Sequence, residues 1–329
     1  MNYKESKQIL EKIKKAKRIV INCHRSPDPD SVGSALSLRK WLLTLHKEVT
    51  IISSDKISEN LSFLEGFKEI IQTDFSKFDF SLYDIFISID TENLFHVGFS
   101  DEEKPDITII NIDHHYGNRI GGEINLIDPE VSSSSEVLYN FFKDVNFRYE
   151  AKVAQMLLVG ICTDTGFFQF VNTFPSTLRV AATLREQGAD YNEIVFHILR
   201  QNSLDLLKLT GEFLTRLKID EKHHFVWSAI PYPVYKKYKI TDNVTGYITN
   251  ILLRTIQDTN FGMAIVERSN KNTTMSLRSR IPGFDVSLIG KQVGGGGHKD
   301  ASGGKIQGVP FKDAVEMYLT AARQYGNEK

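Results

Sequence analysis

The strongest constraint on the fold is a series of short apolar runs that alternate with stretches of helical periodicity. The runs cover residues 18–23, 48–53, 84–89 and 107–112 and are rich in isoleucine and valine. Continuous β-branched runs of this kind are typical of strands buried on both faces of a parallel sheet. Helical stretches such as residues 31–45 supply the crossovers that parallel strands need. The pattern predicts an α/β fold with a mostly parallel sheet and helices on both faces.

The periodicity changes in the second half of the chain and indicates a second domain. We expect residues 1–200 to form one domain and residues 218–329 a smaller C-terminal α/β domain, with connecting helices over about 185–217. Ser133 and Glu136 have the spacing of a capping box, which predicts a helix beginning there. The second domain is expected to contain strands at 224–230, 261–268 and 272–279 and helices near 245–257, 284–292 and 310–324.

The charge balance excludes one class of function. Lys and Arg number 40 while Asp and Glu number 41, so the net charge is −1. Proteins that hold long duplex nucleic acid by bulk positive charge need a large basic excess. We therefore expect no long duplex partner, although a local basic groove is compatible with this total.

Cysteine content and hydropathy bear on the compartment. The two cysteines, Cys23 and Cys162, cannot form a disulfide framework, which favours a reducing cytosol. No run approaches the ~18 apolar residues of a membrane span, and the first residues lack a signal-peptide core. The expectation is a soluble, cytoplasmic protein without a membrane partner.

Acidic and imidazole side chains follow three of the predicted strands at the point where each strand ends. They are His24, Asp28 and Asp30 after 18–23, Asp90 after 84–89, and Asp113, His114 and His115 after 107–112. Because ligands of open parallel sheets lie beyond the carboxyl ends of the strands, these groups are expected at one edge. Asp164, at the end of an apolar helical stretch, is a further candidate.

Several carboxylates in one small volume repel one another, and bound divalent cations remove that repulsion. Asp-x-Asp after a strand is also common in turns and helix N-caps, and a single Asp at a strand end is usually structural. The joint placement on consecutive strands favours metal binding over these alternatives. Oxygen-rich ligands with a few imidazoles suit Mn²⁺ better than structural Zn²⁺. Two such cations activate water for attack on a phosphoryl group.

A glycine run and an arginine in the second half have two interpretations each. Gly294–Gly297, followed by His298, is either a helix C-cap with a loop or a backbone nest for an anion. Arg278 is either an exposed charge at a strand end or a bidentate phosphate ligand.

Taken together, these motifs resemble the DHH phosphoesterase superfamily. The resemblance lies in His24-Arg-Ser-Pro-Asp-Pro-Asp30, Asp90, Asp113-His-His115 and Asp164, in that order. Asp113-His-His-Tyr-Gly-Asn118 and Ser132–Glu136 are similar to the NrnA-like, RecJ-related subgroup of oligoribonucleases and PAP phosphatases. Ser276-Leu-Arg-Ser279 and Gly294–His298 resemble the C-terminal domain of the same family, so the resemblance spans nearly the whole chain.

The resemblance implies a role for each matching residue. One cation would be held by His24, Asp28 and Asp90, and the other by Asp30, Asp90, His114 and Asp164, with Asp90 bridging. His115 would face the scissile phosphate, and Asp113 would orient its neighbours. Substrate would be bound by Arg278, Ser279, Gly295, Gly296, Gly297 and His298. Two departures from the family pattern are Pro29 and Ser31 in the first motif and an arginine missing after Asp90.

By the same resemblance, the protein is a metal-dependent hydrolase of short oligonucleotides or nucleotides, including 3′-phosphoadenosine 5′-phosphate, with substrate between the domains. A homodimer is compatible with this resemblance. The alternatives are a cyclic or linear di-adenylate phosphodiesterase, a manganese inorganic pyrophosphatase and a nucleotide-binding protein without catalysis.

Overall fold

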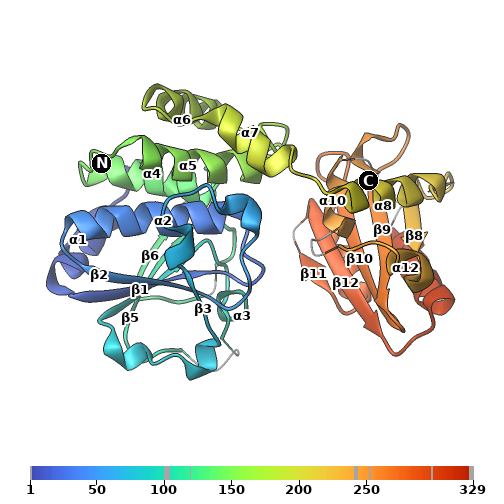
Figure 1. Cartoon of the computed structure of the whole chain (residues 1–329), viewed down its shortest axis with the longest axis horizontal. Coiled ribbons are helices and arrows are strands. Elements are labelled where there is room, and N and C mark those ends of the chain that lie inside the picture. The colour runs from blue at the N-terminus through green and yellow to red at the C-terminus, as the bar shows by residue number, and fades with distance from the viewer. Residues whose placement is uncertain are drawn as a thin grey trace. The chain divides into compact units, whose positions relative to one another are not determined.

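The computed structural model describes residues 2–99, 104–118, 120–240, 244–251, 253–297 and 299–325 (Figure 1). The chain divides into two compact units, Met1–Gln201 and Asn202–Lys329. Each unit contains its own six-stranded sheet. Among the described residues, none of the helices is both long enough and apolar enough to cross a bilayer.

The first unit is built on a wholly parallel sheet with the order β3-β2-β1-β4-β5-β6. The strands are β1 (Arg18–Cys23), β2 (Glu48–Ser53), β3 (Ile71–Gln72), β4 (Ile85–Ile89), β5 (Thr108–Asp113) and β6 (Ile124–Ile127). The four runs predicted as strands are confirmed to within a residue. Strand order reverses between β1 and β4, and a crevice for ligands opens at such a reversal in α/β sheets.

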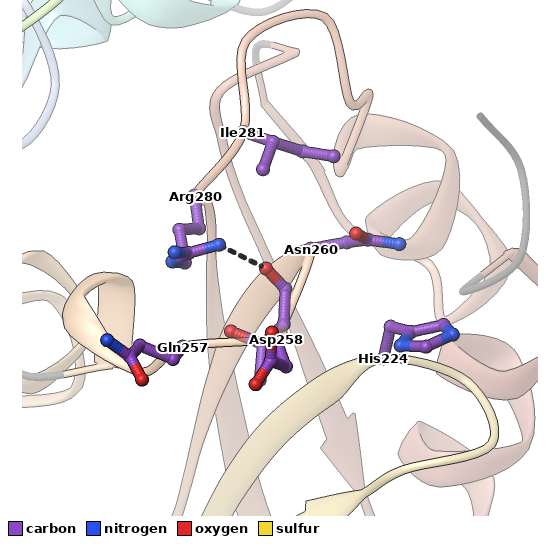
Figure 2. A pocket seen from close by; sticks show the side chains of 7 residues that line it. His224, Gln257, Asp258, Asn260, Arg280 and Ile281 are labelled. Carbon is purple, nitrogen blue, oxygen red and sulfur yellow. Dashed lines mark hydrogen bonds between the residues drawn. The ribbon is translucent and has the colours of Figure 1, made fainter.

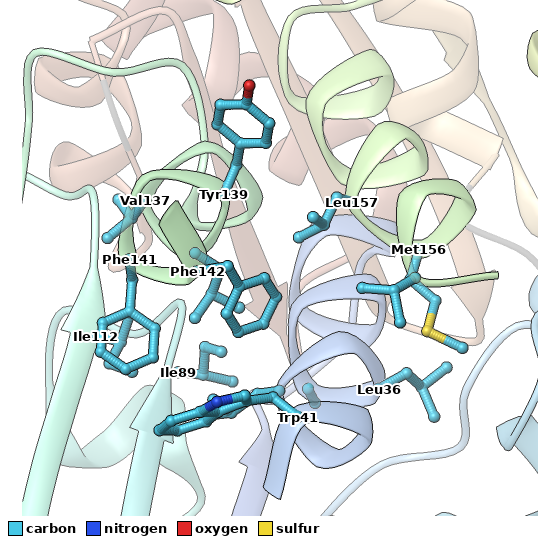
Figure 3. Packing of buried hydrophobic residues seen from close by; sticks show 14 of the residues in the cluster. Leu36, Trp41, Ile89, Ile112, Val137, Tyr139, Phe141, Phe142, Met156 and Leu157 are labelled. Atoms are coloured by element: carbon cyan, nitrogen blue, oxygen red, sulfur yellow. The ribbon is translucent and has the colours of Figure 1, made fainter. Parts of the chain in front are cut away.

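Long helices lie on one side of this sheet. They are α1 (Glu5–Lys15), α2 (Pro29–Thr44), α4 (Ser134–Asp144), α5 (Ala151–Asp164), α6 (Pro175–Glu186) and α7 (Tyr191–Leu199). The helices α1, α2 and α4 contact the strands, α5 packs on α2 and α4, and α6 and α7 form an outer layer on α5 (Figure 1). The apolar core of this unit includes an aromatic pair: Trp41 of α2 meets Phe141 of α4 edge to face, with ring centroids 5.0 Å apart (Figure 3). At Gly33, a Cβ would lie 2.3 Å from the Met156 carbonyl, so glycine is what lets α2 pack closely on α5.

Short helices cover the opposite face. They are the 3₁₀ turns η3 (Phe75–Lys77) and η4 (Phe80–Leu82) and the helix α3 (Leu94–Val97). Phe75, Phe86 and Phe99 pack edge to face in the apolar cluster that these turns close over the sheet. The predicted architecture, a mostly parallel sheet with helices on both faces, is confirmed, with long helices restricted to one side.

The second unit has a mixed sheet with the order β11-β12-β10-β9-β8-β7, in which only the β8–β9 pair is parallel. Its strands are β7 (Lys218–Asp220), β8 (Phe225–Ile230), β9 (Phe261–Ser269), β10 (Asn272–Ser279), β11 (Gly296–Gly297) and β12 (Ala301–Gln307). Its helices are α8 (Leu204–Thr215), α9 (Tyr232–Tyr235), α10 (Val244–Ile251), η5 (Leu253–Thr255), α11 (Ser287–Gln292) and α12 (Phe311–Tyr325). The hydroxyl of Ser228 in β8 donates to the Phe213 carbonyl at 2.7 Å, which joins α8 to this sheet.

The N-terminal helix α1 is attached to α4 by one carboxylate. Asp144 accepts hydrogen bonds from the Tyr3 amide at 2.8 Å and the Ser6 hydroxyl at 2.8 Å. We expect Asp144→Ala to lower the free energy of unfolding by about 2 kcal/mol, because hydrogen bonds to a charged acceptor are lost. Chemical denaturation measures this loss, and Glu11→Ala, on the exposed face of α1, should change stability by less than about 0.5 kcal/mol.

The same carboxylate makes the attachment of α1 sensitive to pH. Burial acts to raise the pKa of Asp144, but hydrogen bonds from Asn2 and Tyr3 outweigh it and the pKa lies below its ordinary value. The stabilisation is therefore fully present above the ordinary Asp pKa of about 3.9 and is lost as pH falls through the lowered value. Amide exchange in α1 that stays equally slow below that pH would contradict this assignment.

Candidate metal centre

Residues that follow β1 form the first side of the site. The Asp28 carboxylate caps α2 by accepting from the Ser31 amide at 2.9 Å, with Pro29 as the first helical residue. His24 Nδ1 lies 2.8 Å from the Arg25 carbonyl and must carry the proton of that hydrogen bond. Its Nε2 faces the cluster, 3.4 Å from Asp28 Oδ1 and 3.5 Å from Asp90 Oδ2. Although burial opposes the charged form, these two carboxylates raise the pKa of His24 well above its usual value, so a cation bound at Nε2 would displace a proton.

Asp30 is buried in the first turn of α2, and its carboxylate meets the N-terminus of α4. Its Oδ2 accepts from the Ser134 amide at 2.8 Å and its Oδ1 from the Ser135 amide at 3.0 Å. Amides at a helix N-terminus have no partner within the helix and carry partial positive charge, so they stabilise a carboxylate there. The fold thus provides two donors to a carboxylate that water cannot reach.

Asp90 follows β4 in a left-handed conformation, with φ of 55°. This conformation is unfavourable for a residue with a side chain and persists only where its surroundings impose it. The Asp90 amide donates to the Ile112 carbonyl at 3.0 Å, and its Oδ1 accepts from the Ser134 hydroxyl at 2.9 Å. These contacts hold the carboxylate between the ends of β1 and β5.

Asp113 ends β5 and is completely buried. It accepts from His115 Nδ1 at 2.7 Å, from the His114 amide at 2.8 Å and from Asn118 Nδ2 at 2.6 Å. Asn118 also donates to the Thr91 carbonyl at 2.8 Å, which ties this segment to the turn after β4. Asp113 therefore orients the imidazole of His115 and holds the backbone of His114.

Asp164 is the last residue of α5 and reaches the same cluster. Its Oδ2 lies 3.4 Å from His114 Nε2, which is in turn 3.6 Å from Asp90 Oδ1. Gly160, one turn earlier, allows this approach: a Cβ there would lie 2.2 Å from Asp30 Oδ1 and 2.1 Å from the Ser135 hydroxyl.

The structure thus brings all eight predicted residues of the first unit into one cluster. Within each of three groups, one ligand atom per residue lies within 4.8 Å of the others. The groups are His24, Asp28 and Asp90; Asp30, His114 and Asp164; and Asp90, Asp113, His114 and His115. Atom separations of 3.4–3.6 Å are those expected of two ligands, each about 2.1 Å from one cation.

The electrostatics of the protein groups alone show a shortage of positive charge. Burial and neighbouring carboxylates raise the pKa of Asp30 well above its usual value, and the same causes raise the pKa of Asp164. Although burial opposes its charged form, Asp113 raises the pKa of His115 to about 10. Burial and the charge of His115 lower the pKa of His114, which leaves a neutral imidazole suited to metal ligation. The donor set fits divalent cations.

The predicted substrate residues lie in the second unit. Burial and the charge of Arg254 lower the pKa of Arg278 to about 10. Arg278 Nε donates to Asn250 Oδ1 at 2.6 Å, so α10 orients this guanidinium. Ser279 is buried and donates its hydroxyl to the Ile281 carbonyl at 2.7 Å; its contact with substrate stays a prediction. His298 lies outside the described residues.

The glycine run has a packing role that its composition did not reveal. Gly296 and Gly297 form the short strand β11 beside β12. A Cβ at Gly295 would lie 1.9 Å from the Gly303 carbonyl, and one at Gly297 would lie 2.4 Å from the Ala301 carbonyl. Side chains at these two positions would therefore push β11 off β12, whatever the run also binds.

A polar pocket of about 570 Å³ lies at the end of β10 (Figure 2). The Arg280 guanidinium faces it and donates to the Thr259 carbonyl at 3.0 Å. Its lining comes from three separate segments, so spacing along the chain could not predict it. The lining residues are His224, Gln257, Asp258, Thr259, Asn260, Arg280 and Ile281.

The first unit is a parallel sheet that carries aspartates and histidines at its strand reversal, and the second is a separate mixed-sheet domain. These features define a class of two-domain α/β proteins with a candidate metal centre. Residues 18–161 match the DHH family, N-terminal domain, and residues 229–328 match the DHHA1 domain. The chain therefore contains a DHH domain followed by a DHHA1 domain.

Named relatives are similar over nearly the full length. The bifunctional oligoribonuclease and PAP phosphatase NrnA of Thermus thermophilus is 26% identical, covering 98% of this chain and 95% of the relative. NrnA of Bacillus subtilis is 26% identical, covering 90% and 92%. An exopolyphosphatase-related protein from Bacteroides fragilis has the same fold, with a TM-score of 0.90 at 24% identity over 98% and 96% of the two chains. The predicted family resemblance and the prediction of a phosphoesterase are confirmed.

Proposed function

We propose that this protein hydrolyses short oligonucleotides, and 3′-phosphoadenosine 5′-phosphate, with two divalent cations, Mn²⁺ by preference. The observation that carries the proposal is the position of Asp90. Its Oδ2 lies 3.5 Å from His24 Nε2 and its Oδ1 lies 3.6 Å from His114 Nε2, so one carboxylate faces two groups of ligands. The names of the NrnA relatives support the choice of substrate.

The residues divide into two sets around this shared carboxylate. His24, Asp28 and Asp90 would hold one cation, and Asp30, Asp90, His114 and Asp164 the other. When bound, two divalent cations neutralise phosphate charge and acidify water for in-line attack. Oxygen donors with two imidazoles favour Mn²⁺ over zinc.

The remaining groups of the chain bind and orient the substrate. His115 is held at Nδ1 by Asp113, at 2.7 Å, so its Nε2 is the atom left to donate to a phosphoryl oxygen. Arg278 offers a planar fork of donors suited to a second phosphate or a base edge. The net charge of −1 gives no long basic track, which favours short substrates gripped at a few points.

We expect Arg278→Gln to raise KM about tenfold to a hundredfold while kcat changes less, because charge-assisted hydrogen bonds to bound substrate are lost. Steady-state kinetics with a dinucleotide measure both constants. Arg216→Gln, which removes a guanidinium paired with Glu212 elsewhere in the second unit, is the matched control and should leave KM unchanged. A fall in kcat at constant KM would place Arg278 in transition-state stabilisation instead.

One assay tests the proposed function. The purified protein, with Mn²⁺ and with EDTA, is incubated with RNAs of two to twenty-four nucleotides, linear and cyclic di-adenylate, 3′-phosphoadenosine 5′-phosphate and pyrophosphate. We expect Mn²⁺-dependent release of mononucleotides from the shortest RNAs and phosphate from the bisphosphate nucleotide. Turnover confined to di-adenylates or to pyrophosphate would contradict the proposal and support one of the alternatives.

A further inference from the structure

The run Ser132–Ser135 gives each of its serines a different set of hydrogen bonds, although all four are buried. Ser132 donates to Glu136, and Ser133 caps α4 by accepting from the Glu136 amide at 3.1 Å. The Ser135 hydroxyl lies 3.0 Å from the Ser34 hydroxyl. Two hydroxyls of this run reach carboxylates of the metal centre: that of Ser134 donates to Asp90, and that of Ser135 contacts Asp30.

Ser134 contacts two carboxylates that follow different strands of the sheet. Its amide donates to Asp30 Oδ2 at 2.8 Å, and its hydroxyl donates to Asp90 Oδ1 at 2.9 Å. Asp30 follows β1 and Asp90 follows β4, so one residue at the start of α4 joins both sides of the strand reversal. In the proposed centre Asp30 and Asp90 share one cation, and Asp90 also serves the other together with His24.

The hydroxyl bond bears on the rotation of the Asp90 carboxylate. The terminal torsion of aspartate is broad and has only a weak preference of its own. With Oδ1 held by Ser134, the two oxygens face opposite ways, Oδ1 toward His114 and Oδ2 toward His24. That orientation is the one a carboxylate needs to serve two groups of ligands at once.

The serine run is itself held in place by the carboxylate of Glu136. Glu136 Oε2 accepts from the Ser132 amide at 3.0 Å, the Ser132 hydroxyl at 2.6 Å and the Thr177 hydroxyl at 2.8 Å. These bonds fasten the segment before α4 to α6. Ser134 is therefore presented by a backbone that these hydrogen bonds hold in place.

From these contacts we infer that Ser134 is a positioning residue that sets the affinity of the centre for divalent cations by fixing the rotation of Asp90. The inference rests on the proposed metal centre and deepens it. Groups that hydrogen-bond to metal ligands typically change metal affinity about tenfold to a hundredfold when they are removed. The loss is expected in binding itself, before any substrate is present.

The test titrates metal-free full-length protein with Mn²⁺ in a calorimeter and compares the Mn²⁺ affinity of serine variants with that of the wild type. Ser134→Ala should weaken Mn²⁺ binding about tenfold to a hundredfold. Ser134→Thr keeps the hydroxyl and should bind within about threefold of the wild type. Ser228→Ala removes a buried hydroxyl that donates to the Phe213 carbonyl in the second unit; it is the matched control and should leave affinity unchanged. Ser133→Ala should lower the melting temperature by loss of the cap, with Mn²⁺ affinity retained.

The outcomes separate this inference from the function on which it rests. Equal Mn²⁺ affinity for Ser134→Ala and Ser228→Ala, with the wild type binding Mn²⁺, overturns the role of Ser134 and leaves the proposed centre standing. Failure of the wild type to bind Mn²⁺ overturns the centre itself. If Ser134→Ala is unfolded without metal, the Ser134→Thr variant provides the test. Loss of Mn²⁺ affinity in a folded Ser134→Thr variant, which keeps the hydroxyl, also overturns the inference.

Discussion

Asp90→Asn is expected to remove at least about a thousandfold of the Mn²⁺-dependent turnover, the largest loss for any single substitution in this protein. The reason is that, among the residues the structure describes, Asp90 is the one carboxylate that faces both His24 and His114. A bound cation contributes several kcal/mol to a phosphoryl-transfer barrier, and each 1.36 kcal/mol is about tenfold in rate. Initial rates on a dinucleotide at saturating Mn²⁺ measure this loss.

Stability measurements distinguish this loss from unfolding. The substitution removes one negative charge from a buried cluster in which burial and neighbouring carboxylates already raise the pKa values of Asp30 and Asp164. In EDTA, the Asp90→Asn variant should therefore melt at the same temperature as the wild type or above it. Addition of Mn²⁺ should raise the melting temperature of the wild type only. An equal rise in the variant would show that Asp90 is not a ligand.

A single methyl group at position 160 is expected to destabilise the first unit by about 3 kcal/mol and to abolish metal binding. In the structure a Cβ on Gly160 would lie 2.1 Å from the Ser135 hydroxyl and 2.2 Å from Asp30 Oδ1. Overpacking a close-packed core costs about 1–3 kcal/mol, and here the displaced atoms belong to the metal centre. Urea denaturation and Mn²⁺ calorimetry of Gly160→Ala measure the two effects.

Gly211→Ala is the matched control, because it places the same methyl group on a helical glycine with no neighbour within 4 Å. Alanine has the higher helix propensity, so this change should stabilise α8 by up to about 1 kcal/mol. If Gly160→Ala were as stable as the wild type and bound Mn²⁺ equally well, α5 could not lie as close to Asp30 as the structure places it.

Much of the first unit was predictable because short-range patterns decide it. Apolar β-branched runs predicted β1, β2, β4 and β5, and parallel strands carry whatever follows them to a common edge. That rule was enough to expect His24, Asp90 and Asp113 together. Their individual roles as ligands or acids remain predictions.

Other elements left no comparable signal. Strand β12 is Ala-Ser-Gly-Gly-Lys-Ile-Gln, whose glycines carry no apolar alternation, yet its backbone pairs with β10 along the whole strand. The 3₁₀ turns η3 and η4 are too short for periodicity to detect. The capping box at Ser133 and Glu136 was recognisable as the start of a helix, but nothing in its spacing indicated that Ser134 would contact Asp30 and Asp90.

The sequence by itself determined which residue types end each strand, and hence that carboxylates and imidazoles gather at one edge of a parallel sheet. Only the tertiary structure decided how those groups are held: the amides of α4 at Asp30, the hydroxyl of Ser134 on Asp90, and the bare backbone of Gly160 that lets α5 approach. The physical reason is range. Strand and helix periodicity act between residues a few positions apart, whereas these contacts join residues 25 to 130 positions apart through packing. Asp30, for example, meets Ser134, which is 104 positions later in the chain, and lies against Gly160.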